Sequence, residues 1–296
     1  MENKFLYRLS QLLAFVLGTK LLMVVVLTFA LYVSTFFLFN QEESLRAFAF
    51  DFRVHAIIFC AIVSIGAGGI INQFYDKEKD KITRPFRTKL QSFLKQKYFL
   101  YAYVFLNSIS LAVAGFISVR VLIFFLFYQF LIWFYSHKIS KILILNNLTF
   151  VSLSLYPFFG MLIYYQTFSI KIVLMATFLF GLLLVIDIIK DSLTKHADAI
   201  FGYHTLPNTF KKTVVNRLII SLLVFLILNS ILIVMKKGLT GIMSYYYLSG
   251  ILIFIFSAFL LVSNKKNAKF YTLNILRFWI FIGILAMLFD GIIMKW

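Results

Sequence analysis

The sequence is poor in cysteine, proline and acidic residues. Its 296 residues include one cysteine, Cys60, three prolines, and eleven aspartates and glutamates. A single cysteine excludes an intramolecular disulfide, and so few prolines leave the apolar runs almost free of helix-breaking residues. Only 14% of the residues are charged and 62% are hydrophobic, which is more apolar surface than a soluble domain of this length can bury. The composition therefore predicts an all-α integral membrane protein.

Nine apolar runs are long enough, or nearly so, to cross a hydrocarbon layer as helices of ~20 residues. We expect them to form one transmembrane domain over residues 1–296. Pro85 and Pro207 are expected in loops, whereas Pro157 lies inside the fifth run and should bend it. The runs are roughly 20–39, 54–72, 98–118, 119–135, 143–165, 170–187, 215–235, 243–262 and 274–293.

The formal net charge of +18 arises from lysines and arginines in the segments between the apolar runs. No basic stretch is long enough to suggest a nucleic-acid partner. Of the 29 lysines and arginines, 22 fall on one predicted side of the membrane and seven on the other. This asymmetry predicts a multi-pass protein of the cytoplasmic (inner) membrane, with the N-terminus and the acidic loops on the cytoplasmic side.

A polar stripe begins where the second apolar run ends. Asn72, Asp76 and Asp80 are spaced i, i+4, i+8, so a helix that continues past the run carries all three on one face. One carboxamide and two carboxylates can hold Mg²⁺, which usually takes one or two protein carboxylates and fills its other positions with water and phosphate oxygens. A diphosphate fits this arrangement, and nearby basic residues can offset its charge. These residues are Lys77, Lys81, Arg84 and Arg87.

The alternative is a solvated segment in which the carboxylates of residues 76–80 pair with the lysines between them. Asn72 favours a functional site, because a polar side chain within the membrane costs free energy and usually has a functional role.

A second acidic cluster follows the sixth apolar run. Asp187, Asp191 and Asp198 fall within a helical strip about 40° wide, and Thr194 lies beside them. Carboxylates so close together repel each other unless a cation or basic groups lie in front of them, and a charged group at the hydrocarbon boundary is usually functional. The alternative is local pairing with basic neighbours, namely Lys190, Lys195 and His196.

A third polar group flanks the short loop between the fourth and fifth runs. It consists of Tyr135, Ser136, Lys138, Lys141 and Asn147. These residues could line a headgroup pocket, but for most of them we favour the alternative, anchoring by Tyr and Lys at the membrane interface.

Two segments resemble the motifs of a known family. NQFYDKEKDKITRP, from Asn72 to Pro85, resembles the first aspartate-rich motif of UbiA-type intramembrane prenyltransferases, N-D-x-x-D-x-x-x-D followed by R-P. The segment from Lys190 to Asp198, followed by GYHTLP at residues 202–207, resembles the second motif with its trailing G-x-x-T-L-P. The middle region around Tyr135 is similar as well. The resemblance implies the fold of that family, nine transmembrane helices in a bundle with a central cavity.

The resemblance also implies roles for individual residues. Asn72, Asp76 and Asp80 would bind one Mg²⁺, and Asp191 and Asp198 a second, so that the four aspartates would be catalytic. Both ions would bind one diphosphate at a single mouth of the bundle. The other residues expected to contact the diphosphate are Asn72, Arg84, Arg87, Lys190, Lys141 and Tyr135.

The implied activity moves an isoprenyl group from an allylic isoprenyl diphosphate to an aromatic (quinone-precursor-like) or lipid acceptor, with release of pyrophosphate. Membrane lipids are the other expected partners. Two alternatives stay open. One is a glycerol-phosphate lipid geranylgeranyltransferase, and the other is a non-catalytic carrier or transporter of a phosphorylated lipid.

The sequence departs from the family pattern at three places. Gln73 replaces the aspartate that usually follows the asparagine, and Thr194 replaces an aspartate four residues before Asp198. Residues 88–92 replace a proline-containing run. A threonine hydroxyl can bind a cation or a water but carries no charge, so the second ion is expected to bind more weakly.

Overall fold

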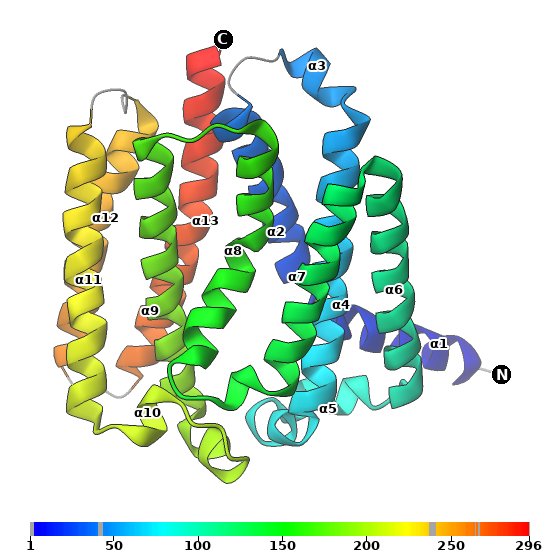
Figure 1. The fold of residues 1–296 in the computed structure, drawn as a ribbon. Coiled ribbons are helices and arrows are strands. Elements are labelled where there is room, and N and C mark those ends of the chain that lie inside the picture. Colours follow the sequence, from blue (N-terminus) through cyan, green and yellow to red (C-terminus); the bar gives the residue numbers. More distant parts are fainter. Residues whose placement is uncertain (1–2, 41–43, 237–240, 264, 266, 296) are drawn as a thin grey trace. The chain divides into compact units, whose positions relative to one another are not determined.

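The computed structural model describes residues 3–40, 44–236, 241–263, 265 and 267–295, and every regular element in these ranges is a helix (Figure 1). By length and composition, nine of the described helices can cross a membrane, which confirms the predicted fold class. These spans are Leu21–Phe39, Phe52–Thr83, Gln96–Ile117, Val119–His137, Leu145–Tyr165, Ile170–Ile200, Lys212–Met235, Ile242–Val262 and Ala268–Ile293.

The chain divides into two compact units, one of residues 1–32 and 43–140 and one of residues 33–42 and 141–296. The first unit contains α1 (Asn3–Gly18), most of α2 (Leu21–Ser34), α3 (Leu45–Ala49), α4 (Phe52–Thr83), α5 (Pro85–Gln91), α6 (Gln96–Ile117) and α7 (Val119–His137). The second contains a π-helix (Thr35–Phe39), α8 (Leu145–Tyr165), α9 (Ile170–Ile200), α10 (Leu206–Thr209), α11 (Lys212–Met235), α12 (Ile242–Val262) and α13 (Ala268–Lys295). A 3₁₀ turn, Ile139–Lys141, lies at the boundary.

A buried polar network joins α4, α6 and α7 in the first unit. The hydroxyls of Ser64 and Ser110 lie 3.0 Å apart, and Gln129 Nε2 donates to Ser64 Oγ at 3.2 Å. Ser110 Oγ also donates to the Cys60 carbonyl at 3.1 Å. Such bonds between helices satisfy polar groups that neither lipid nor apolar side chains can satisfy. They therefore fix how α6 and α7 pack against the N-terminal half of α4.

The helix α1 packs against α4 and α6 through Ala14, Ile70 and Phe99. The contact is close because α4 has a glycine there. A Cβ added at Gly69 would lie 3.0 Å from the carbonyl oxygen of Thr19, tighter than side chains normally allow. The C-terminal end of α1 therefore lies directly on α4, one turn before Asn72.

In the second unit, α9, α11, α12 and α13 lie side by side (Figure 1), and they share one apolar core. Fully buried side chains such as Leu182, Leu226 and Phe254 fill it, and Tyr246 stacks on Trp279 with ring centroids 4.8 Å apart. This core holds α9 in place, and α9 in turn carries the second acidic cluster.

The helices extend further than the apolar runs. The runs ended near residues 72 and 187, whereas α4 continues to Thr83 and α9 to Ile200. The expectation that Pro85 and Pro207 lie in loops was wrong. Each lies in the first turn of a short helix, α5 or α10, where a missing backbone N–H leaves no hydrogen bond unmade. Gly202, with φ of +71°, follows the end of α9, as a helix stop requires.

Candidate diphosphate and metal site

The continuation of α4 places the first polar stripe on one helical face, as its spacing predicted. Asn72 Nδ2 donates to Asp76 Oδ2 at 2.7 Å, and Thr83 Oγ1 lies 3.3 Å from Asp80 Oδ1. Asn72, Asp76 and Asp80 are all partly buried. The bond from Asn72 holds the Asp76 carboxylate in a defined orientation one turn away.

Two charged residues between these positions, Lys77 and Glu78, lie on the exposed side of α4. Glu78 pairs with Lys81 at 2.8 Å, with both side chains more than half exposed, and Lys77 Nζ donates to Gln96 Oε1 at 3.1 Å. The alternative proposed for this segment, pairing of its carboxylates with nearby lysines, is therefore present for Glu78, which does not belong to the polar stripe. Because surface pairs of this kind contribute little to stability, the segment combines a solvated face with a separate polar stripe.

Two arginines follow the stripe in different environments. Arg84 ends α4, is exposed, and donates its backbone N–H to the Asp80 carbonyl at 2.8 Å. Arg87 is partly buried on α5, and its Nη2 donates to the carbonyl oxygen of Leu17 at the C-terminal end of α1. Burial and the neighbouring Arg84 lower the pKa of Arg87 from its ordinary value, while Asp80 raises it; a guanidinium remains charged throughout the physiological range.

Gln73 lies on the α1 side of α4. A Cβ added at Gly18 would lie 3.0 Å from Gln73 Oε1, and this amide oxygen is buried with no hydrogen-bond partner. Where the family motif has an aspartate, this chain thus has a neutral side chain against the end of α1. An ionised carboxylate at the same place would face the partial negative charge of that helix end.

Three aspartates line one face of α9 and are buried in the second unit. Asp187, Asp191 and Asp198 are 2%, 7% and 0% exposed. Asn147 Nδ2, from α8, donates to Asp187 Oδ2 and to Asp191 Oδ2, both at 2.8 Å. Lys190 Nζ lies 2.6 Å from Asp187 Oδ1 and 3.9 Å from Asp191 Oδ1. One lysine thus faces two buried carboxylates.

Asn146 is a site residue that the sequence analysis did not identify. Its Nδ2 donates to Asp191 Oδ2 at 3.2 Å. The amide oxygens of Asn146 and Asn147 are buried and make no hydrogen bond, and buried orphan acceptors of this kind are uncommon. Two adjacent asparagines at the start of an apolar run were the signal available in the sequence.

The local pairing proposed as an alternative for this cluster is present at Lys190, which also lies 4.9 Å above the ring centroid of Phe150.

Thr194 takes a different role. Its Oγ1 donates to Asp198 Oδ2 at 2.7 Å, so the threonine orients the carboxylate that the family pattern would pair with another aspartate.

The segment after α9 folds back toward α8. Tyr203 N–H donates to the Asp198 carbonyl at 2.9 Å, and His204 N–H donates to the Lys141 carbonyl at 3.1 Å. Lys141 Nζ lies 5.3 Å from the centroid of the Tyr203 ring, an attractive cation–π arrangement. Lys141 itself is exposed, so its ammonium group stays accessible to an anionic ligand.

Tyr135 is partly buried on α7 and belongs to the first unit, together with Asn72, Asp76 and Asp80. Arg84 and Arg87 belong to the first unit as well, whereas Lys141 and Lys190 belong to the second, together with Asn146, Asn147 and the α9 aspartates. The structure thus divides the candidate residues between the two units.

The residues of the two clusters are better suited to hold Mg²⁺ together with a phosphate ligand than to enclose a metal ion with protein ligands alone. Within the described ranges, no three His, Cys, Asp or Glu side chains are grouped to hold a metal. Each cluster instead combines carboxylates with neutral oxygen donors, and the orphan oxygens of Asn146 and Asn147 add unused acceptors in the second. Mg²⁺ commonly takes one or two carboxylates and completes its octahedron with water and phosphate oxygens.

A family model described as the UbiA prenyltransferase family matches residues 46–282. No curated protein sequence matches the chain significantly.

Solved structures match over nearly the whole length. A structure described as digeranylgeranylglyceryl phosphate synthase is 18% identical with a TM-score of 0.72, covering 95% of this chain and 99% of that one. A UbiA homologue from Archaeoglobus fulgidus bound to GPP and Mg²⁺ is 14% identical with a TM-score of 0.66, covering 93% and 99%. A homologue from Aeropyrum pernix K1 is 14% identical with a TM-score of 0.61, covering 92% and 97%. At these identities, the likeness shows the shared fold.

Proposed function

Because the chain belongs to the UbiA prenyltransferase family, we propose that it transfers an isoprenyl group from an allylic isoprenyl diphosphate to an apolar acceptor and releases pyrophosphate. The observation that carries this proposal is the buried group of Asp187, Asp191, Asn147 and Lys190, in which two carboxylates face a single lysine and an amide oxygen lacks a hydrogen bond. Burying carboxylates costs free energy unless cations compensate them. A divalent cation shared with a diphosphate provides that compensation.

We propose that the polar cluster of each unit binds the same donor diphosphate, so that the two units act as a single domain. Asp76 and Asp80 would hold one Mg²⁺ with Asn72, and Asp191 and Asp198 would hold the other. When bound, Mg²⁺ neutralises the charge that builds up on the leaving diphosphate. The four carboxylates would hold the ions, and the amide of Asn147 fixes one of them, Asp191, together with the neighbouring Asp187.

The basic residues act on the same charge. Lys190 and the exposed Arg84 and Lys141 would donate hydrogen bonds to phosphate oxygens of the donor. Donors placed where charge develops stabilise the transition state more than the ground state. The allylic fragment becomes cation-like as the C–O bond breaks, and the surrounding apolar helices exclude water until the acceptor captures it.

A homologue of known structure binds GPP and Mg²⁺, which supports the donor class and the metal. Both an aromatic, quinone-precursor-like acceptor and a glycerol-phosphate lipid suit this chemistry. The similarity to the structure described as digeranylgeranylglyceryl phosphate synthase makes the glycerol-phosphate lipid the second candidate acceptor. Products formed from labelled geranylgeranyl diphosphate and each acceptor, identified by mass spectrometry, separate the two.

We propose that the protein lies in the cytoplasmic membrane with its N-terminus and both acidic clusters on the cytoplasmic side. The lysine and arginine asymmetry between the two predicted sides, 22 against seven, supports this orientation. Labelling of single introduced cysteines by a membrane-impermeant reagent in intact cells would test it, in a Cys60→Ser background. Labelling at position 89 in intact cells would contradict this orientation.

The proposed activity is tested by pyrophosphate release from an allylic diphosphate with purified protein. Asp76→Asn and Asp80→Asn remove one charge each from the stripe and should lower turnover by roughly a hundredfold or more. Glu78→Gln is the matched control, because Glu78 faces solvent and pairs with Lys81. Turnover like that of the wild type in both aspartate variants would refute the assignment, and flux of a phosphorylated lipid without bond cleavage would identify a carrier instead.

A further inference from the structure

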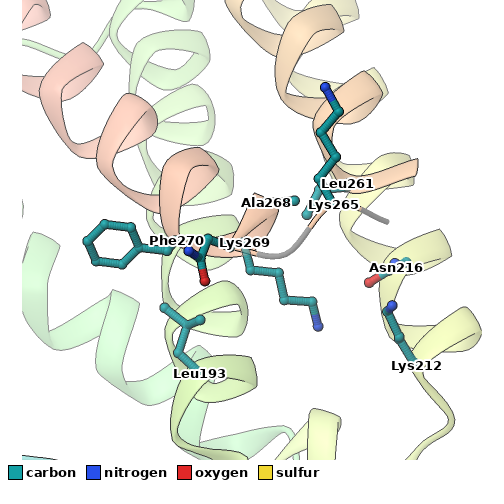
Figure 2. A pocket seen from close by; sticks show the side chains of 9 residues that line it. Leu193, Lys212, Asn216, Leu261, Lys265, Ala268, Lys269 and Phe270 are labelled. Atoms are coloured by element: carbon teal, nitrogen blue, oxygen red, sulfur yellow. The ribbon is translucent and has the colours of Figure 1, made fainter. Parts of the chain in front are cut away.

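A second basic feature lies in the second unit, apart from the aspartates. A cavity of about 240 Å³ opens where α9, α11 and the beginning of α13 meet (Figure 2). Its walls include Leu193 of α9, Lys212 and Asn216 of α11, and Lys269 and Phe270 of α13. We call it the lysine cavity. None of the described residues that line it is acidic.

The charges in the lysine cavity repel one another. Lys269 is partly buried and Lys212 is exposed, and Lys269 lies close enough to Lys212 and Lys195 for their charges to repel its own. The ammonium groups of Lys212 and Lys269 extend into the same space, with the amide of Asn216 beside them (Figure 2). The Asn216 amide oxygen is buried without a hydrogen bond. Like charges close together in a partly desolvated place are costly unless an anion lies between them.

The cavity lies at the level expected for lipid headgroups. Lys212 and Ala268 begin candidate membrane spans, and Val262, next to the lining residue Leu261, ends one. Leu193 is 23 residues along from Ile170, the first residue of α9. At ~1.5 Å per residue this is roughly 35 Å, beyond the ~30 Å of a hydrocarbon core.

The lysine cavity is also separate from the acidic cluster on α9. Leu193 is two residues from Asp191, which at about 100° per residue places it roughly 200° around the helix. The cavity therefore faces the side of α9 opposite the three carboxylates. A ligand there does not share the diphosphate site.

We propose that the lysine cavity binds a phosphate group, carried by the headgroup of an anionic lipid or by soluble phosphate. Lys212 and Lys269 supply the positive charge and the hydrogen-bond donors. Leu193, Leu261 and Phe270 give the cavity apolar walls, which suit the glycerol and first methylene groups of a lipid. Basic pockets at the ends of transmembrane helices recognise anionic headgroups in this way.

The test compares lipids retained by the purified full-length protein. Wild-type protein and the Lys212→Gln/Lys269→Gln double variant are placed in nanodiscs of phosphatidylglycerol and phosphatidylcholine, extracted, and examined by native mass spectrometry. We expect the wild type to retain phosphatidylglycerol preferentially, and the double variant to lose roughly tenfold of this preference. Lys211→Gln is the matched control, because Lys211 is the neighbouring exposed lysine and does not line the cavity.

A second arm distinguishes the sources of the phosphate group. Inorganic phosphate is titrated into lipid-depleted protein in detergent, and binding that depends on Lys212 and Lys269 without lipid enrichment would assign the site to soluble phosphate. A Lys212→Arg/Lys269→Arg variant keeps the charges and should retain the lipid, which guards against a folding defect. Equal lipid retention and equal phosphate binding in the wild type and the glutamine double variant would overturn the proposal.

Discussion

Asn147 on α8 places its amide nitrogen 2.8 Å from the Oδ2 atom of Asp191 on α9, 44 residues later in the chain. The same nitrogen also reaches Asp187 at 2.8 Å. This amide therefore connects two buried carboxylates that would otherwise repel each other, and it fixes the face of α9 that we assign to the donor diphosphate.

The first prediction concerns this amide. Asn147→Leu leaves two buried carboxylates without their shared donor, so the free energy of unfolding should fall by about 1–3 kcal/mol. Asn146→Leu removes one longer bond, 3.2 Å to Asp191, and should cost less. Thermal unfolding in detergent with EDTA measures both. An Asn147→Leu protein as stable as the wild type would show that the carboxylates do not depend on this donor.

The second prediction compares two lysine–carboxylate pairs. Lys190→Met removes the cation that lies 2.6 Å from the buried Asp187, and we expect a loss of about 1–3 kcal/mol of stability because the carboxylate stays buried. Lys81→Met breaks the exposed pair with Glu78 at 2.8 Å and should change nothing measurable. Denaturation curves for both variants make the comparison. Equal destabilisation would contradict the difference in burial on which the site assignment relies.

The third prediction concerns Thr194, which donates to Asp198 at 2.7 Å. Thr194→Asp puts a carboxylate beside another, so the variant should be less stable in EDTA and regain stability with Mg²⁺. The Mg²⁺ concentration for half-maximal pyrophosphate release should also fall. Thr194→Val removes the hydroxyl without adding charge and serves as the control. An unchanged Mg²⁺ dependence in Thr194→Asp would mean that this position is not near the metal.

The fourth prediction separates the two arginines after the first stripe. Arg87→Gln removes the bond to the Leu17 carbonyl, so amide hydrogen exchange in α1 should become faster. Arg84→Gln alters an exposed side chain and should instead raise KM for the donor diphosphate while leaving α1 protected. Mass-spectrometric exchange and steady-state kinetics on the same preparations give both readouts. Slower turnover with normal α1 protection in Arg87→Gln would assign Arg87 to the ligand instead.

Local spacing in the sequence was enough to predict the long helices that carry the candidate site residues. The i, i+4, i+8 pattern of Asn72, Asp76 and Asp80 correctly indicated that α4 continues beyond its apolar run. The clustering of aspartates after residue 186 likewise indicated the extension of α9. Such periodicity is readable because helical neighbours are three or four residues apart.

Contacts between distant segments could not be read in the same way. The bond from Asn146 to Asp191 joins residues 45 apart, and that from Arg87 to Leu17 joins residues 70 apart. Both depend on how one helix packs on another, which spacing along a single helix does not encode. The short helices α5 and α10 were missed because proline was interpreted as a loop signal, although it is equally favoured in the first helical turn.

The central claim is that the aspartates of α4 and those of α9 act on one diphosphate. Calorimetric titration of a non-hydrolysable isoprenyl diphosphate analogue with Mg²⁺, on wild type, Asp76→Asn, Asp191→Asn and the double variant, tests it most directly. We predict that one analogue binds per chain and that each single variant loses roughly tenfold or more in affinity. The fold-loss in the double variant should differ clearly from the product of the fold-losses in the two single variants. Two independent analogue sites per chain, or unchanged affinity in either single variant, would contradict it.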